Sequence, residues 1–251
     1  MNTNNNTQDK MRKMKFFGML RAFKASLEDK QNEKYSADEM VSHLIETEFD
    51  ERQNRNIAAK TKNAKFRYKA SVEEIVFDDL RNIDRNLVLR FADCEFITKH
   101  ENILITGSTG VGKSYIASAI GHQACSLGYR VLYQNTPKLF SRLKMAKTDG
   151  SYLREIAKFE RHQLLILDDF GLQPLDAPSR SSLMEIIEDR YGKGSIIITS
   201  QVPIAKWHDV IGEKTVADAI LDRIIHAAHR LELFGESMRK KRNTLTEINQ
   251  N

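Results

Sequence analysis

Residues 103–121 read ILITGSTGVGKSYIASAIG, and this stretch decides the fold. The apolar run at its start predicts a buried strand, and the run after the glycines predicts a helix. The chain has only 12 glycines in 251 residues, and three of them, Gly107, Gly110 and Gly112, fall between these two runs. The turn between strand and helix matches the spacing G-x-x-x-x-G-K-[ST], through Gly107, Gly112, Lys113 and Ser114.

This spacing is that of a phosphate-binding loop. Glycines let consecutive backbone N–H groups turn inward without side-chain clashes, and the helix N-terminus favours an anion. We expect Lys113 to reach the β- and γ-phosphates of ATP, and the Ser114 hydroxyl to hold Mg²⁺. The expected ATP-binding residues are Gly107, Ser108, Thr109, Gly110, Val111, Gly112, Lys113, Ser114 and Tyr115. A chance match in an ordinary turn is the alternative, and the flanking strand and helix argue against it.

The composition fits one α/β domain with room for a smaller module. The net charge of +5 and the pI near 9.1 permit a polyanionic partner without demanding one. No apolar run reaches the roughly 18 residues of a membrane span, and the polar start MNTNNNTQDK does not resemble a signal peptide. Cys94 and Cys125 lack metal-ligand spacing, so we expect reduced thiols in a cytoplasmic protein.

Four segments are expected along the chain. Residues 1–10 are polar and Asn-rich, which predicts a disordered tail. Residues 11–70 have apolar residues at helical spacing and a Ser-x-x-Glu capping box at Ser36, which predict a small, basic, all-helical domain. Residues 71–238 form the expected ATPase domain, and residues 239–251 a basic or disordered tail.

Five apolar runs in the ATPase domain predict strands, and helical patterns separate them. The runs are NILIT, YRVLYQ, QLLILD, SIIITS and HRLEL. Continuously apolar strands that alternate with helices favour a parallel sheet covered on both faces, which is an α/β fold.

Two carboxylates end the third of these runs, in LLILDD. Asp168 and Asp169 should therefore lie at the carboxyl edge of the sheet, where the phosphate loop also lies. Hydrolysis requires a carboxylate for the metal and a group that orients water. We assign Asp168 to the Mg²⁺ shell and Asp169 to polarising the attacking water, although either residue could instead cap the next turn.

Polar residues also end the fourth run. Gln201 is the preferred contact for the γ-phosphate or the attacking water, and Ser200 is the second choice. Ordinary polarity at a strand end is the alternative. The residues that bind the adenine base are less evident from the sequence, and Phe77 and His100 are the candidates.

An arginine in the last helical pattern needs a charged partner. If Thr215 opens this helix, Arg223 lies beside its apolar stripe, where an arginine is normally paired. Arg223 is either an arginine finger that enters the nucleotide site of a neighbouring subunit, or a local partner of Asp189 or Asp222.

Three basic clusters are candidates for neutralising DNA phosphates. The first runs from Arg52 to Lys69 without an acidic residue, so its charges repel one another unless an anion is present. The second lies on the predicted helix PKLFSRLKMAK, and the third, at residues 239–242, is better explained as a solvated surface. The expected DNA contacts are Arg52, Arg55, Lys60, Lys62, Lys65, Arg67, Lys138, Arg142 and Lys144.

Read at length, the chain resembles the IstB family of AAA+ ATPases, the helper ATPases of insertion-sequence transposition. The resemblance covers residues 15–242. Its generic part is the phosphate loop, which many nucleotide-binding proteins share. The resemblance also includes FFGMLRAF, DERQNRNIAAKTKNAKFR and LLILDDFG. Its more specific segments are TSQVPIAKWH, LDRIIHAAHR and GESMRK.

The resemblance implies an AAA+ core with strand order 5-1-4-3-2, without a C-terminal helical lid. It implies ATP and Mg²⁺ as cofactors, and a homo-oligomer with nucleotide sites at subunit interfaces. It further implies sequence-nonspecific binding of duplex DNA, selection of the insertion site, stimulation of a cognate transposase and disassembly on hydrolysis. Without a lid, a neighbouring subunit must close the site, which favours Arg223 as a finger. The family is similar to DnaC-type replicative helicase loaders, and helicase loading is the alternative function.

Overall fold

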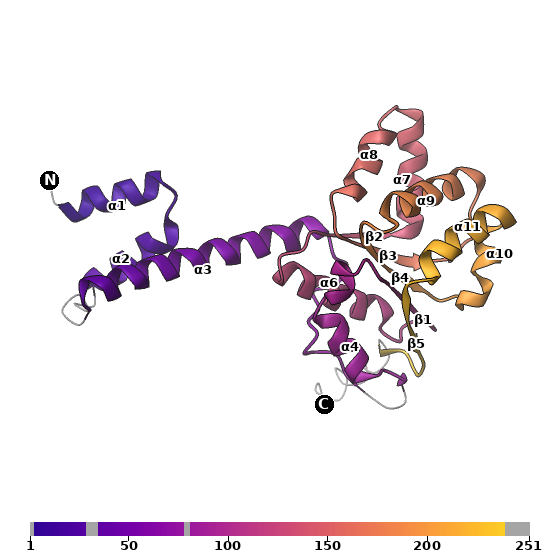
Figure 1. Cartoon of the computed structure of the whole chain (residues 1–251), viewed down its shortest axis with the longest axis horizontal. Coiled ribbons are helices and arrows are strands. Elements are labelled where there is room, and N and C mark those ends of the chain that lie inside the picture. The colour runs from indigo at the N-terminus through magenta and orange to yellow at the C-terminus, as the bar shows by residue number, and fades with distance from the viewer. Residues whose placement is uncertain (1–2, 29–34, 78–80, 239–251) are drawn as a thin grey trace, which may run out of the picture. The chain divides into compact units, whose positions relative to one another are not determined.

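The computed structural model describes residues 3–28, 35–77 and 81–238 (Figure 1). The chain divides into two compact units, Met1–Ala59 and Lys60–Asn251. This division falls earlier than the domain boundary that we expected after residue 70. Within the described residues, no helix has both the length and the apolar character needed to cross a membrane.

The first unit is helical. Its helices are α1 (Thr3–Lys13), α2 (Phe17–Glu28) and most of α3 (Ala37–Ala64). Helix α1 covers residues 3–10, where we expected part of a disordered tail, and residues 1–2 of that tail lie outside the described residues. It buries no residue, but an Asp9–Arg12 ion pair of 2.9 Å supports it locally. Basic residues in its last turn also complement the helix dipole.

Helices α2 and α3 approach closely, through a glycine and a buried glutamate. A Cβ atom on Gly18 would lie 2.5 Å from the Thr47 carbonyl oxygen, so only glycine permits this contact. The Glu48 carboxylate accepts hydrogen bonds from the Gly18 and Met19 amides at 2.7 and 3.2 Å, which satisfies donors at the start of α2. The predicted capping box before α3 is confirmed, since the Ser36 amide donates to Glu39 at 2.7 Å.

The second unit contains a five-stranded parallel sheet with the order β2-β3-β4-β1-β5. Read from the other edge, this is the predicted order 5-1-4-3-2. The strands coincide closely with the five apolar runs. They are β1 (Asn102–Gly107), β2 (Val131–Asn135), β3 (Leu164–Phe170), β4 (Ser195–Ser200) and β5 (Ala228–Leu233).

Helices cover both faces of this sheet (Figure 1). On one face lie α4 (Arg85–Ala92), α5 (Glu95–Thr98) and α6 (Lys113–Ser126). On the other face lie α7 (Thr136–Thr148), α8 (Tyr152–Glu160), α9 (Ala177–Arg190), the 3₁₀ turn Ile204–Lys206, α10 (Trp207–Ile211) and α11 (Lys214–Ile225).

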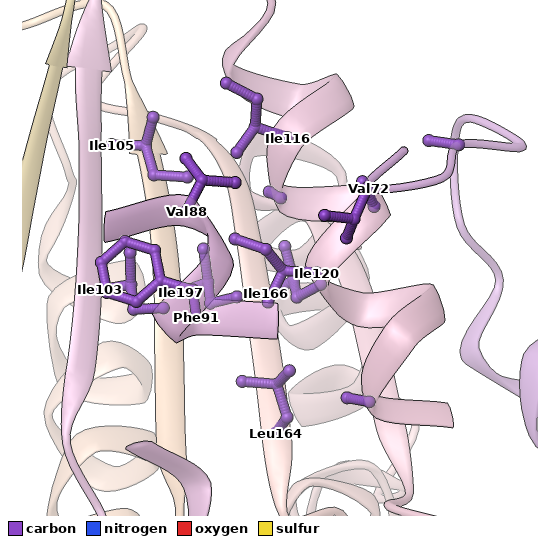
Figure 2. Close-up of a cluster of buried hydrophobic side chains, with 14 of the residues drawn as sticks. Val72, Val88, Phe91, Ile103, Ile105, Ile116, Ile120, Leu164, Ile166 and Ile197 are labelled. Atoms are coloured by element: carbon purple, nitrogen blue, oxygen red, sulfur yellow. The ribbon is translucent and has the colours of Figure 1, made fainter. Parts of the chain in front are cut away.

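The central strands explain why the chain adopts these layers. Ile103 and Ile105 of β1 face α4 and α6, as Figure 2 shows, whereas Leu104 between them packs into the opposite core. All three side chains are fully buried. Burial of each is worth about 1.5–3 kcal/mol, so an apolar run without alternation fits only a strand that is covered on both faces.

The start of α11 differs from the one that the sequence predicts. Glu213, and not Thr215, caps α11, and its carboxylate accepts from the Thr215 and Val216 amides at 3.1 and 2.7 Å. After β5, the Met238 amide donates to the Gly110 carbonyl at 3.0 Å. The expected tail at residues 239–251 lies outside the described residues, so the predicted lack of a lid stays a prediction.

Candidate nucleotide site

The turn between β1 and α6 has the backbone of a phosphate-binding loop. Gly107 and Gly112 have φ angles of +143° and +100°, which favour glycine. A Cβ atom on Gly107 would lie 2.2 Å from the Leu233 carbonyl oxygen of the neighbouring strand. Glycine is therefore required at this position both by its backbone conformation and by the close approach of β5.

Lys113 lies inside the loop. Its side chain is buried, and its ammonium donates to the Gly107 and Ser108 carbonyl oxygens at 2.8 and 2.7 Å. Lys113 is also the first residue of α6, so its charge is placed beside the amides of the helix N-terminus. This is the arrangement that binds phosphate groups.

Asp168 lies at the end of β3 and is fully buried. Its carboxylate accepts hydrogen bonds from the hydroxyls of Ser114, at 2.6 Å, and of Thr199 and Tyr133. Burial and the hydrogen bond to this carboxylate raise the pKa of Tyr133 above its ordinary value. The Tyr133 hydroxyl therefore stays protonated and donates.

The donor set at Asp168 fits Mg²⁺. Hydroxyl and carboxylate oxygens are hard ligands, and Mg²⁺ is commonly bound by one or two carboxylates together with substrate phosphates. Ser114 and Asp168 supply such oxygens side by side. In the described part of the chain, no group of three or more His, Cys, Asp and Glu side chains could hold a metal.

Asp169 has different surroundings. Its φ angle is +60°, and the pairing of β3 with β4 shifts register between Leu167 and Phe170. Its amide donates to the Thr199 hydroxyl at 3.1 Å, and its carboxylate accepts from the Asn135 amide group at 3.0 Å. The carboxylate lines the cavity beside the phosphate loop. Asn135, at the end of β2, is a site residue that the sequence interpretation missed.

Arg67 contacts both aspartates, which the sequence interpretation did not anticipate. Its Nη1 atom lies 3.4 Å from Asp168 Oδ2 and 3.1 Å from Asp169 Oδ2. The DNA contact that we expected of Arg67 stays a prediction. Burial by itself would lower the pKa of Arg67, but Tyr68, Tyr133 and the two carboxylates raise it above its ordinary value. A carboxylate that is fully buried requires compensation of its charge, and Arg67 contributes to it here.

The two residues predicted after β4 differ in role. The Gln201 side-chain oxygen accepts from the Thr109 hydroxyl of the phosphate loop at 2.6 Å, and Gln201 lines the cavity. Ser200 is fully buried, and its hydroxyl donates to the Phe170 carbonyl at 2.7 Å and accepts from the Val202 amide at 3.0 Å. The geometry therefore favours Gln201 over Ser200 as a contact for substrate or water.

A cavity of about 570 Å³ opens beside the phosphate loop, within the range of small-molecule sites. Part of its wall comes from the segment before α4 and from the end of the described chain, neither of which the sequence interpretation assigned to the base. These wall residues include Tyr68, Ile75, Val76 and Met238. Among the described residues, Phe77 and His100 are not part of the lining.

Arg81 connects this wall to the phosphate loop. Its buried guanidinium donates to the Val76 and Val111 carbonyl oxygens, each at 2.6 Å, and its own carbonyl accepts from the Phe234 amide at 3.1 Å. The segment before α4, the loop and the chain after β5 are thus tied together. No sequence motif marks this arginine.

Arg223 is paired within its own chain. Its Nη2 atom lies 3.0 Å from Glu188 Oε1 on α9, and its Nη1 atom donates to the Ala219 carbonyl at 2.8 Å. The partner is therefore Glu188 and not Asp189 or Asp222. Within the described residues, Arg223 is not part of the cavity lining.

The remaining candidates for DNA contacts have varied surroundings. Arg142 is paired with Glu155 at 3.2 Å, and Lys144 is paired with Asp176. Arg52 is paired with Glu48 at 2.7 Å. Arg55, Lys62, Lys65 and Lys138 are exposed, and Lys60 is partly buried.

Solved structures with a similar fold include the helicase loaders. The chain matches a structure of DnaI with a TM-score of 0.57 and 24% identity, covering 66% of this chain and 91% of that one. It matches a structure of the DnaC helicase loader with a TM-score of 0.53 and 22% identity, covering 66% of this chain and 97% of that one. These likenesses concern the fold alone.

The chain also matches sequence relatives over most of its length. A putative insertion sequence ATP-binding protein of Sinorhizobium fredii is 44% identical over 93% of this chain and 96% of the relative. The putative ATP-binding protein of insertion sequence IS21 from Pseudomonas aeruginosa is 32% identical over 81% of this chain and 77% of the relative. The family model described as IstB-like ATP binding protein matches residues 9–246. The chain therefore belongs to the IstB-like ATP-binding protein family.

Proposed function

We propose that this protein is an ATPase of the AAA+ type that acts in the cytoplasm during insertion-sequence transposition. The observation that carries the proposal is the convergence of two segments, the phosphate-binding loop and the end of β3, on one cavity. Lys113 lies in a phosphate-binding loop, the Ser114 hydroxyl lies 2.6 Å from the Asp168 carboxylate, and Asp169 lines the same cavity. Binding, metal and hydrolytic groups are thus within reach of one nucleotide.

Each side chain has a proposed role. Lys113 and the loop amides bind the phosphates, and Ser114 with Asp168 would hold Mg²⁺, which neutralises charge that develops on them. Asp169 polarises the attacking water, because its carboxylate is partly exposed in the cavity. Gln201 orients this water or contacts the γ-phosphate, through a position set by its hydrogen bond from Thr109.

We propose further that residues 71–238 act as the ATPase domain of a homo-oligomer. Arg223 would enter the nucleotide site of the neighbouring subunit as a finger. Its side chain is 26% exposed, and its partner Glu188 is 55% exposed. Exposed ion pairs are worth at most about 1 kcal/mol, so opening this pair costs little compared with stabilising a transition state.

The proposed partners are duplex DNA and a cognate transposase. The protein would assemble on DNA with ATP, help to select the insertion site, and leave DNA after hydrolysis. The exposed lysines Lys62, Lys65 and Lys138 are the preferred contacts for phosphates. Arg142 and Lys144 would first have to leave Glu155 and Asp176. The names of the relatives support the transposition context.

A DnaC-type helicase loader is the second candidate, favoured by the fold shared with the DnaC helicase loader. The two candidates differ in their expected partner. A transposase gene immediately upstream of the gene for this protein would support the first function. A neighbouring gene for a primosome component would support the second. The higher identity to insertion-sequence relatives favours the first.

The substitution Lys113→Ala tests nucleotide binding directly. It removes an ammonium that lies inside the loop. Hydrogen bonds from such a charged group to the phosphates of a bound nucleotide would be worth about 1.5–3 kcal/mol each. We expect the Kd for a fluorescent ATP analogue to rise about a hundredfold, with an unchanged circular dichroism spectrum. Lys69→Ala, an exposed lysine, serves as the control. An unchanged Kd for Lys113→Ala would show that nucleotide binds elsewhere.

A further inference from the structure

Arg67 has no role in the function proposed above, yet it contacts both carboxylates at its centre. A single nitrogen, Nη1, lies 3.4 Å from Asp168 Oδ2 and 3.1 Å from Asp169 Oδ2. The side chain of Asp168 is fully buried, whereas the side chain of Arg67 is 41% exposed. The guanidinium therefore covers the carboxylates from the solvent side of the cavity.

The backbone that carries Arg67 is held on both sides. The Phe66 ring lies against the His122 ring of α6, with ring centroids 4.2 Å apart and ring planes tilted by 33°. The His122 ring nitrogen Nε2 lies 3.1 Å from the Tyr68 carbonyl oxygen. Because both neighbours are anchored to α6, the guanidinium can leave the carboxylates by a change of side-chain rotamer alone. Its partial exposure means that water can solvate it after it leaves.

The same carboxylates are those that a magnesium ion would need. A guanidinium and a divalent cation near one carboxylate pair repel each other, and the repulsion is strong where the site is shielded from water. The hydroxyl groups of Ser114, Tyr133 and Thr199 that bind Asp168 are neutral, so they do not compete in this way. Arg67 and the metal therefore oppose each other's binding, and linkage makes this opposition reciprocal.

We propose that Arg67 gates the metal site: its guanidinium holds Asp168 and Asp169 until Mg²⁺ with nucleotide displaces it. This inference rests on the proposed ATPase function and adds a positioning residue to it. The gate stabilises the buried carboxylates in the metal-free protein and sets the Mg²⁺ concentration at which nucleotide binds tightly. It also connects the nucleotide site to the basic segment that contains Lys65, Arg67 and Lys69.

The test is the coupling between metal and nucleotide. The Kd of a fluorescent ATP analogue is measured for the full chain in EDTA and across a Mg²⁺ series. The coupling is the Kd in EDTA divided by the Kd at saturating Mg²⁺. We expect Arg67→Gln to raise this ratio at least about threefold and to lower the Mg²⁺ midpoint. Arg67→Lys, which keeps the charge, should stay near the wild type, as should the control Lys69→Gln.

The outcomes separate this inference from the proposed function. A gain in coupling that comes from a lower Kd in Mg²⁺ cannot arise from partial misfolding, which would weaken binding. An unchanged or lowered ratio for Arg67→Gln would overturn the gate. Equal losses of affinity in EDTA and in Mg²⁺ would also overturn it, because they would identify Arg67 as a phosphate ligand. If the wild type does not bind the analogue under any condition, the proposed function itself fails.

Discussion

Asp168 and Asp169 are neighbours in the sequence, but the fold gives their carboxylates different surroundings. Asp168 is fully buried among three hydroxyl groups, and Asp169 has a left-handed backbone conformation and a side chain that is 20% exposed. A buried, multiply hydrogen-bonded carboxylate suits a fixed metal ligand, and a partly exposed one suits contact with water. This contrast supports the separate roles proposed for the two residues.

Asp169→Asn should separate ATP binding from hydrolysis. The amide keeps the size of the side chain and its position near Asn135, but it cannot accept a proton or polarise water as a carboxylate does. We expect unchanged affinity for ATP and a loss of turnover of about 10²–10⁴-fold, measured by phosphate release. Turnover close to the wild-type rate would move the hydrolytic role to another residue.

Gln201 and Ser200 offer a matched pair of substitutions. We expect Gln201→Ala to lower turnover about tenfold or more, because Gln201 lines the cavity and is bound to Thr109. Ser200→Ala should instead lower the free energy of unfolding by about 1 kcal/mol, since it removes a buried hydrogen bond to Phe170. Equal effects of both changes on turnover at unchanged stability would contradict this assignment.

The phosphate loop and the twin aspartates were predictable at this scale because their chemistry is local in sequence. Arg67 was not, because its contact with Asp168 joins residues 101 positions apart. A run of basic residues predicts an anionic partner, but the sequence does not distinguish a DNA phosphate from a buried carboxylate. Asn135 was missed for the same reason, since only the pairing of β2 with β3 brings it to Asp169.

At the scale of elements, the strands were the most predictable feature. Strands β1 to β4 are short apolar runs that are buried on both faces, and this requirement leaves a clear pattern in the sequence, whereas in β5 Arg230 and Glu232 are exposed. Helix starts were harder to predict. The start of α11 has both Thr215 and Glu213 within reach of its first amides, and the glutamate caps it. Helix α1 was missed because it buries no apolar residue.

The contact between α2 and α3 should depend on pH. Burial raises the pKa of Glu48, but the hydrogen bonds from Arg52, Met19 and Gly18 outweigh it and hold the pKa below its ordinary value. A carboxyl whose pKa is lowered by folding stabilises the folded state when it is ionised. Its contribution is therefore complete well above pH 4.5 and is lost as the pH falls through the lowered pKa.

The measurement for this contact is hydrogen exchange of the Gly18 and Met19 amides between pH 3 and 7, corrected for intrinsic exchange. Protection should decrease at acid pH in the wild type. Glu48→Gln should have lower protection at neutral pH and a flatter dependence on pH. A wild-type profile without any decrease at acid pH would show that the Glu48 contact does not stabilise α2.

At the scale of the whole molecule, one unit carries the nucleotide site and basic residues are distributed over both. The groups proposed to bind phosphate, metal and water come from one chain, whereas among the described residues the proposed finger, Arg223, is not part of that chain's own cavity lining. A monomer would therefore bind ATP but hydrolyse it slowly. Rapid hydrolysis would therefore depend on oligomerisation.

The most direct test of the central claim is sedimentation velocity with a fluorescently labelled duplex, the full chain, Mg²⁺ and either ATP or ADP. Asp169→Asn keeps ATP intact during the run, and Lys113→Ala is the control that lacks nucleotide. We expect the duplex to sediment with a multimer only with ATP, most clearly for Asp169→Asn, and to sediment alone with ADP or with Lys113→Ala. A chain that stays monomeric and leaves the duplex unbound at saturating ATP would contradict the account.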